Sequence, residues 1–144
     1  MTATSTNDSR SIRARGFIYP LGLWVVMAVV AVINGGLREM ILIPRIGADA
    51  GHVLSTGILI AVILVLTYSY FTRTTITYTR GELLLVGVIW VILTVGFEFL
   101  IGYIAGIPVS EIIAQYDVFA GHVWIFVPLT LLVAPFFVDS YVAK

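Results

Sequence analysis

The amino-acid sequence predicts an all-α membrane protein in which four transmembrane helices form an up-down bundle, with a short interfacial helix between helices three and four. Two observations support this fold class. Hydrophobic residues make up 60% of the 144 positions and charged residues only 11%, whereas soluble domains carry about 25% charged residues. The apolar residues also gather into four runs, each approaching or reaching the roughly 20 residues that a helix needs to cross a bilayer. The lipid bilayer is therefore the first predicted partner.

The composition also limits the available chemistry. Lys plus Arg and Asp plus Glu number 8 each, so no net charge points to nucleic acid as a partner. Cysteine is absent, which excludes disulfides, thiolate metal sites and thiol catalysis. No cofactor or metal is predicted, and nothing in the sequence favours an enzyme.

The first segment, residues 1–16, is polar and rich in Ser and Thr, with three Arg residues before the first apolar run. It is expected to be a disordered cytoplasmic tail that ends in a basic anchor. The first span covers about 17–36, and Pro20 falls in its first turn, where a missing N–H does little harm. A signal peptide is the alternative, but the apolar run is longer than a usual h-region and no clear Ala-x-Ala site follows it. An uncleaved helix is the better interpretation.

The next spans are predicted at about 53–71, 83–103 and 123–138. Pro128 and Pro135 interrupt the last of them. A bend is therefore expected there, and neighbouring helices must cover the carbonyl groups that proline leaves free.

Residues 107–117, between the third and fourth spans, form the predicted interfacial helix. Apolar side chains recur there at helical spacing, at Val109, Ile112, Ile113 and Tyr116. Polar residues occupy the other face. This pattern is typical of a short amphipathic helix that lies on the membrane surface.

Positive residues indicate the topology. With four spans, six of them fall on one side, namely Arg10, Arg13, Arg15, Arg73, Arg80 and Lys144. Only Arg38 and Arg45 fall on the other side. The positive-inside rule therefore predicts a multi-pass protein of the cell membrane with both termini in the cytoplasm.

Glu98 lies within the third apolar run, where an acidic side chain costs on the order of 3 kcal/mol and usually has a partner, a cavity or a task. At about 1.5 Å per residue, Glu98 lies about 22 Å along a core about 30 Å thick, in the outer leaflet. Asn34 and Arg38 of the first span reach a similar level and share a helix face. We expect an Arg38–Glu98 ion pair, with Asn34 able to hydrogen-bond either member and Glu39 nearby.

Small and polar residues recur along one face of the third span. They are Gly87, Thr94, Glu98, Gly102 and Ala105, and Gly106 adds a Gly-x-x-x-Gly pattern. Helix contacts in lipid favour such residues because they let backbones approach. Gly87, Thr94, Gly102 and Gly106 are therefore predicted to mediate helix packing, and Glu98 is predicted to face inward.

Two histidines fall near the same level. His52 opens the second span and His122 the fourth, each within a Gly-His-Val segment. Three alternatives stay open: a divalent metal held by His52, His122, Glu39 and Glu98, a haem between the two histidines, or proton exchange between one His and Glu98. The spacing matches no known ligand motif. Aromatic residues near helix ends, Trp24 and Trp124 among them, are assigned to the membrane-interface belt.

Several segments carry a resemblance. Asn34-Gly-Gly-Leu-Arg38-Glu39, Gly51 to Ser55, Trp90-x-x-x-Thr94-x-x-x-Glu98-Phe99 and Tyr116 to Trp124 together resemble a group of small prokaryotic four-helix integral membrane proteins. The likeness spans most of the chain. It implies the architecture and no activity. Fluoride channels and small multidrug exporters fit less well, since the former carry a Thr-Thr-Phe-Ser-Thr signature that this chain lacks and the latter place their membrane Glu in the first helix.

Three functions stay open from the sequence. The favoured one is a structural or accessory subunit in which Arg38 and Glu98 form a fixed pair. The alternative is a small homodimeric transporter or channel for a small solute or ion that uses Glu98, since four helices are few to enclose a pathway. The third is a site that acts on a lipid-soluble substrate. Predicted protein partners are a second copy or a larger membrane complex.

Overall fold

The structure is a computed structural model that describes residues 2–117 and 122–142. Met1 and Lys144, at the two ends that the sequence predicts to be cytoplasmic, lie outside the described residues. The described residues fold into helices joined by short turns. These elements are α1 (Thr2–Leu37), the π-helical turn η1 (Arg38–Leu42), α2 (Ile43–Ile46), α3 (Ala48–Arg73), α4 (Arg80–Ile104), α5 (Val109–Ala114), α6 (Phe126–Phe137) and a second π-helical turn, η3 (Val138–Val142).

Three helical segments are long and apolar enough to cross a membrane: Gly16–Ile46, Ala48–Arg73 and Arg80–Ile104. The predictions of a helical fold and of apolar helices long enough to span a membrane are confirmed for these three segments. The fourth predicted span is shorter than the others, because α6 has 12 residues and η3 adds five. At 1.5 Å per residue this is about 25 Å, against a hydrocarbon core of about 30 Å. The helix begins at Phe126, after a turn over residues 122–125 that directs Trp124 into the bundle.

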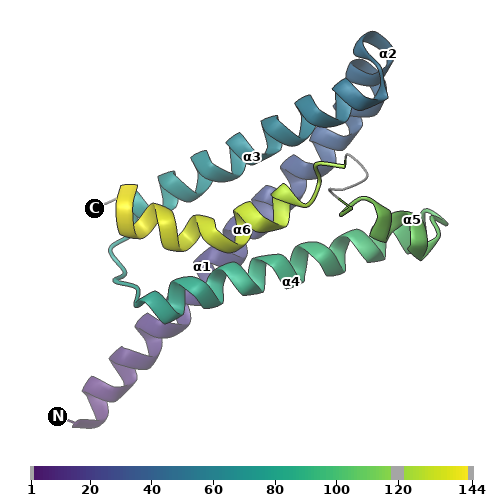
Figure 1. The fold of residues 1–144 in the computed structure, drawn as a ribbon. Helices are drawn as coiled ribbons and strands as arrows, with labels where there is room; N and C mark the ends of the chain where they lie inside the picture. Colours follow the sequence, from purple (N-terminus) through teal and green to yellow (C-terminus); the bar gives the residue numbers. More distant parts are fainter. Residues whose placement is uncertain (1, 118–121, 143–144) are drawn as a thin grey trace.

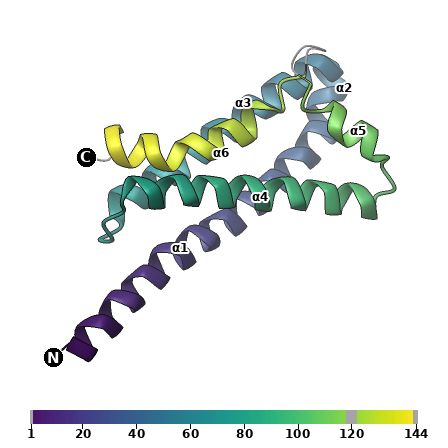
Figure 2. The same cartoon turned by 60° about the horizontal axis from the view of Figure 1, so that its bottom comes forward.

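The elements alternate in direction along the bundle. The start of α1, the connection from α3 to α4, and η3 lie at one end, while α2 and α5 lie at the other (Figure 1). The helix α6 packs most extensively against α4 and next against α3. The helix α1 crosses α4 obliquely and diverges from it toward the α2 end (Figure 2). This divergence leaves space between α1 and α4, and the candidate site lies there.

The first helix differs from expectation at its beginning. Helical backbone extends to Thr2, whereas the sequence predicts a disordered segment over residues 1–16. Pro20 therefore lies inside the helix and not in its first turn. Proline has no N–H group, so the Gly16 carbonyl four residues earlier loses its helical donor.

Side chains from outside α1 compensate for this proline. The Tyr78 hydroxyl donates to the Gly16 carbonyl oxygen at 2.8 Å, and the Trp90 indole donates to the Pro20 carbonyl oxygen at 2.9 Å. Burial, and a hydrogen bond with Tyr70, raise the pKa of Tyr78 above its usual range, so its hydroxyl stays protonated. These hydrogen bonds join α1 to α4 and to the loop that precedes α4.

The closest approach between helices lies where α4 meets α6. A Cβ atom built on Gly87 would overlap the backbone carbonyl of Leu132, so only glycine permits this contact. Trp90, one turn along α4, is fully buried, and Val127 of α6 belongs to the same core cluster. Gly87 therefore sets the distance at which α6 lies on α4.

Replacing Gly87 by alanine should destabilise the protein by at least about 1–3 kcal/mol, because the added methyl group meets backbone that has no alternative rotamer. The matched control is Gly96→Ala in the same helix, where a Cβ meets nothing within 4 Å. Alanine there should stabilise by about 0.5–1 kcal/mol through helix propensity. Denaturant unfolding in detergent measures both, and equal effects of the two changes would contradict this account of α4 and α6.

Candidate functional site

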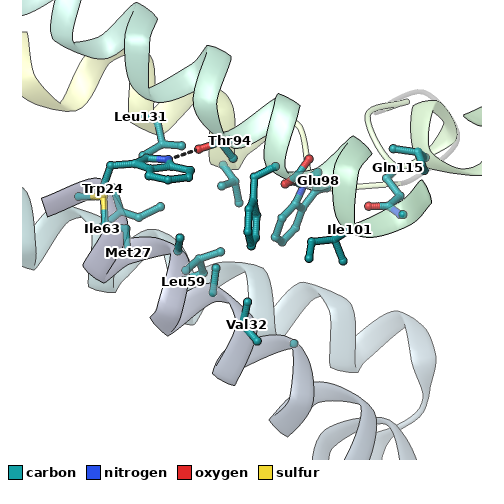
Figure 3. A pocket seen from close by; sticks show the side chains of 18 of the residues that line it. Trp24, Met27, Val32, Leu59, Ile63, Thr94, Glu98, Ile101, Gln115 and Leu131 are labelled. Carbon is teal, nitrogen blue, oxygen red and sulfur yellow. Dashed lines mark hydrogen bonds between the residues drawn. The ribbon is translucent and has the colours of Figure 1, made fainter. Parts of the chain in front are cut away.

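A cavity of about 250 Å³ lies between α1 and α4 where they diverge, with α3 and α6 completing its walls (Figure 3). Most of its lining is apolar. From α1 and α3 come Trp24, Met27, Ala28, Ala31, Val32, Gly35, Leu59 and Ile63, together with Arg38 of η1. From α4 onward come Thr94, Phe97, Glu98, Ile101, Gly102, Ile107, Ile112, Gln115, Trp124, Val127 and Leu131.

Among the described residues of this lining, Glu98 alone has a carboxyl group. Its Oε1 atom accepts a hydrogen bond from the Trp124 indole N–H at 2.7 Å. Its Oε2 atom is buried and has no hydrogen-bond partner. A buried polar atom without a partner is uncommon and calls for an explanation, such as a water, an ion or a ligand that occupies the site.

The predicted Arg38–Glu98 ion pair is wrong. The Arg38 Nε atom instead lies 3.4 Å from Oε1 of its neighbour Glu39. Arg38 begins the π-helical turn that follows α1, and the acidic side chain that it reaches is that of the next residue in this turn. Arg38 still borders the same cavity as Glu98.

Asn34 is also placed differently from expectation. Its amide nitrogen donates to the Ser55 carbonyl oxygen at 3.1 Å and to the Ser55 hydroxyl at 2.8 Å. Both residues are buried. Asn34 therefore joins α1 to α3 and hydrogen-bonds neither Arg38 nor Glu98.

The predicted small-residue face of α4 has several roles in the structure. Thr94, Glu98 and Gly102 line the cavity, and the Thr94 hydroxyl accepts from the Trp24 indole at 2.9 Å. A Cβ on Gly102 would meet the Ile112 side chain of α5, so the absence of a side chain at Gly102 lets Ile112 pack against α4. Gly106 is different, because it has a φ of 76° and open space around it. Its role is a left-handed turn after α4 and not helix packing.

His52 and His122 are exposed and line a separate recess of about 580 Å³ at the end of the bundle formed by α2 and α5. We call this the end recess. Glu39 lies there as well, while Glu98 is bonded to Trp124 and to neither histidine. Within the described residues, no group of three or more His, Cys, Asp or Glu could hold a metal ion, which contradicts the four-residue metal alternative.

The cavity and the end recess share a border. Arg38, Ile107, Gln115 and Trp124 line both. The end recess therefore adjoins the cavity that Glu98 lines.

Sequence reasoning missed the role of the tryptophans. Trp24 and Trp124 were assigned to the membrane interface, but both indoles point into the bundle and donate to Thr94 and Glu98. The available signal was chemical, because a buried indole N–H needs an acceptor. Thr94 and Glu98 were polar groups that needed donors.

Comparison with known proteins gives no match, whether with family models, curated sequences or solved structures. The resemblance to small prokaryotic four-helix membrane proteins stays a prediction. The function must therefore be argued from the residues of this chain.

Double-mutant cycles should identify Trp124 and not Arg38 as the partner of Glu98. Trp124→Phe should cost about 1–3 kcal/mol in the native background, since it leaves a buried acceptor unsatisfied, and much less once Glu98 is alanine. Arg38→Ala should cost less than about 1 kcal/mol, because its bond to Glu39 is exposed. Its effect should be the same within about 0.5 kcal/mol whether or not Glu98 is present. Detergent unfolding measures the cycles, and a coupling confined to Arg38 and Glu98 would refute this assignment.

Proposed function

We propose that this chain is a multi-pass membrane protein that binds a small amphiphilic molecule in the cavity beside Glu98. One observation carries the proposal: a mostly apolar cavity is lined by Glu98, whose buried Oε2 atom has no hydrogen-bond partner. Ligand sites typically combine apolar walls with a few convergent polar groups. The Glu98 carboxyl would bind the polar group of the ligand, and the walls would hold its apolar part.

The cavity volume limits the ligand. Drug-sized molecules occupy pockets of about 300–1,000 Å³, whereas this cavity measures about 250 Å³. An apolar cavity of about 150 Å³ is enough to hold benzene. A single aromatic ring or a short chain that carries one polar group is therefore the expected size.

The structure weakens the structural-subunit hypothesis that the sequence favours and supports the transport alternative. The structural-subunit hypothesis depended on a fixed Arg38–Glu98 pair, and that pair does not form. The transport alternative gains one supporting observation, because the end recess shares lining residues with the cavity that Glu98 lines. Transport by a homodimer would use the same binding site, so binding is the step to test first.

The orientation is part of the proposal. Six positive residues against two favour a protein of the cell membrane with the termini and the α3–α4 loop in the cytoplasm, and α5 on the outer surface of the membrane. The chain has no cysteine, so single cysteines can report the side. A cysteine at Thr75 should react with a membrane-impermeant maleimide only after cells are opened, and one at Ser110 should react in intact cells. The opposite pattern would reverse the orientation.

Binding can be followed by tryptophan fluorescence, because Trp24 and Trp124 both line the cavity. The neutral probe 2-phenylethanol should change the emission of the detergent-solubilised protein in a saturable way. Ala31→Phe, which places a ring in the cavity, should weaken this binding at least tenfold.

The matched control is Ala61→Phe, since Ala61 is exposed on α3 and lies outside the cavity lining. It should bind the probe like the unmodified protein. The absence of a saturable response, or an equal response in the Ala31 and Ala61 variants, would rule out the cavity as a binding site.

A further inference from the structure

We infer that the ligand of this cavity is an organic cation with an apolar body, which reaches Glu98 through the end recess. The inference rests on the proposed function and names its ligand class. Three features of the described residues support it: the charge left without a partner, the aromatic walls, and the balance of charge at the entrance.

The first feature is the missing counter-charge of Glu98. An ionised carboxylate inside a membrane protein needs a compensating positive charge. Among the described residues that line the cavity, Arg38 is the only Arg or Lys, and its guanidinium is bound to Glu39. Trp124 gives Glu98 a hydrogen bond but no charge. A cationic ligand would supply both the charge and a donor for Oε2.

The second feature is the aromatic lining. Trp24 and Phe97 lie edge to face with their ring centroids 6.0 Å apart, and Trp124 adds a third ring beside Glu98. A cation within about 6 Å of such a ring face is attracted by about 0.5–2 kcal/mol, and most strongly by tryptophan. Aromatic walls next to a carboxylate select for a positive group with an apolar body.

The third feature is the charge of the end recess. Its lining contains three exposed carboxylates, Glu39, Asp49 and Glu111, against the single guanidinium of Arg38. A recess lined by excess negative charge raises the local concentration of cations and their rate of entry. Gln115 and Trp124 line both the recess and the cavity. Cations attracted to the recess therefore collect next to the cavity that Glu98 lines.

The test compares two probes of nearly equal shape, 2-phenylethylamine and 2-phenylethanol. The amine is protonated at pH 7, as lysine is with a pKa near 10.4. It should bind at least tenfold more tightly than the alcohol. Glu98→Gln retains an acceptor for Trp124 and removes the charge, so it should abolish this preference and bring the ratio of the two affinities close to one.

Neutralising Glu39, Asp49 and Glu111 together as amides should slow association of the amine at least threefold at low salt and leave the alcohol unchanged, as stopped-flow fluorescence would show. Equal affinity of the unmodified protein for both probes would overturn the cation inference without any variant, and would leave the proposed binding site intact. Unchanged association of the amine would overturn the route through the recess. If neither probe binds, the proposed function itself fails.

Discussion

The structure depends on one constraint of its surroundings: a polar group in hydrocarbon has no water and must find its partner within the protein. The first helix is held by four contacts of this kind. They are Tyr78 to the Gly16 carbonyl, Trp90 to the Pro20 carbonyl, Trp24 to Thr94, and Asn34 to Ser55. Lipid tails are as apolar as the helix side chains, so no hydrophobic driving force brings helices together in a membrane. Van der Waals packing and hydrogen bonds between helices drive their association instead. These contacts therefore determine where α1 lies.

The distribution of the same contacts creates the cavity. Near Pro20, α1 is fastened to α4 through Trp90, and near Asn34 it is fastened to α3. The helix α6 fills the groove of α4 around Gly87. Between these points α1 follows α3 and leaves α4, so the side chains that line the space between α1 and α4 do not fill it. Glu98 lies on the face of α4 that borders this space.

The sequence was sufficient for the helical class, for three of the four predicted spans, and for the inward position of Glu98, because hydrophobic length and small-residue spacing depend on a single helix. It was not sufficient for the partner of Glu98. That partner depends on which acid the long Arg38 side chain reaches, and in the π-helical turn that begins at Arg38 this acid is Glu39. It also depends on a turn before α6 that brings Trp124 inward. Neither turn follows from hydrophobic periodicity, which is the main signal in a chain of this composition.

The loss of the predicted ion pair strengthens the case for binding. A carboxylate paired with Arg38 would have its charge compensated, and a ligand would have to displace a strong interaction in a medium of low dielectric constant. Trp124 acts differently, because an indole N–H occupies one oxygen and orients the carboxyl group without neutralising it. Glu39 meanwhile holds the guanidinium at the border of the cavity. Glu98 is thus oriented by one neighbour, while its buried second oxygen has no hydrogen-bond partner.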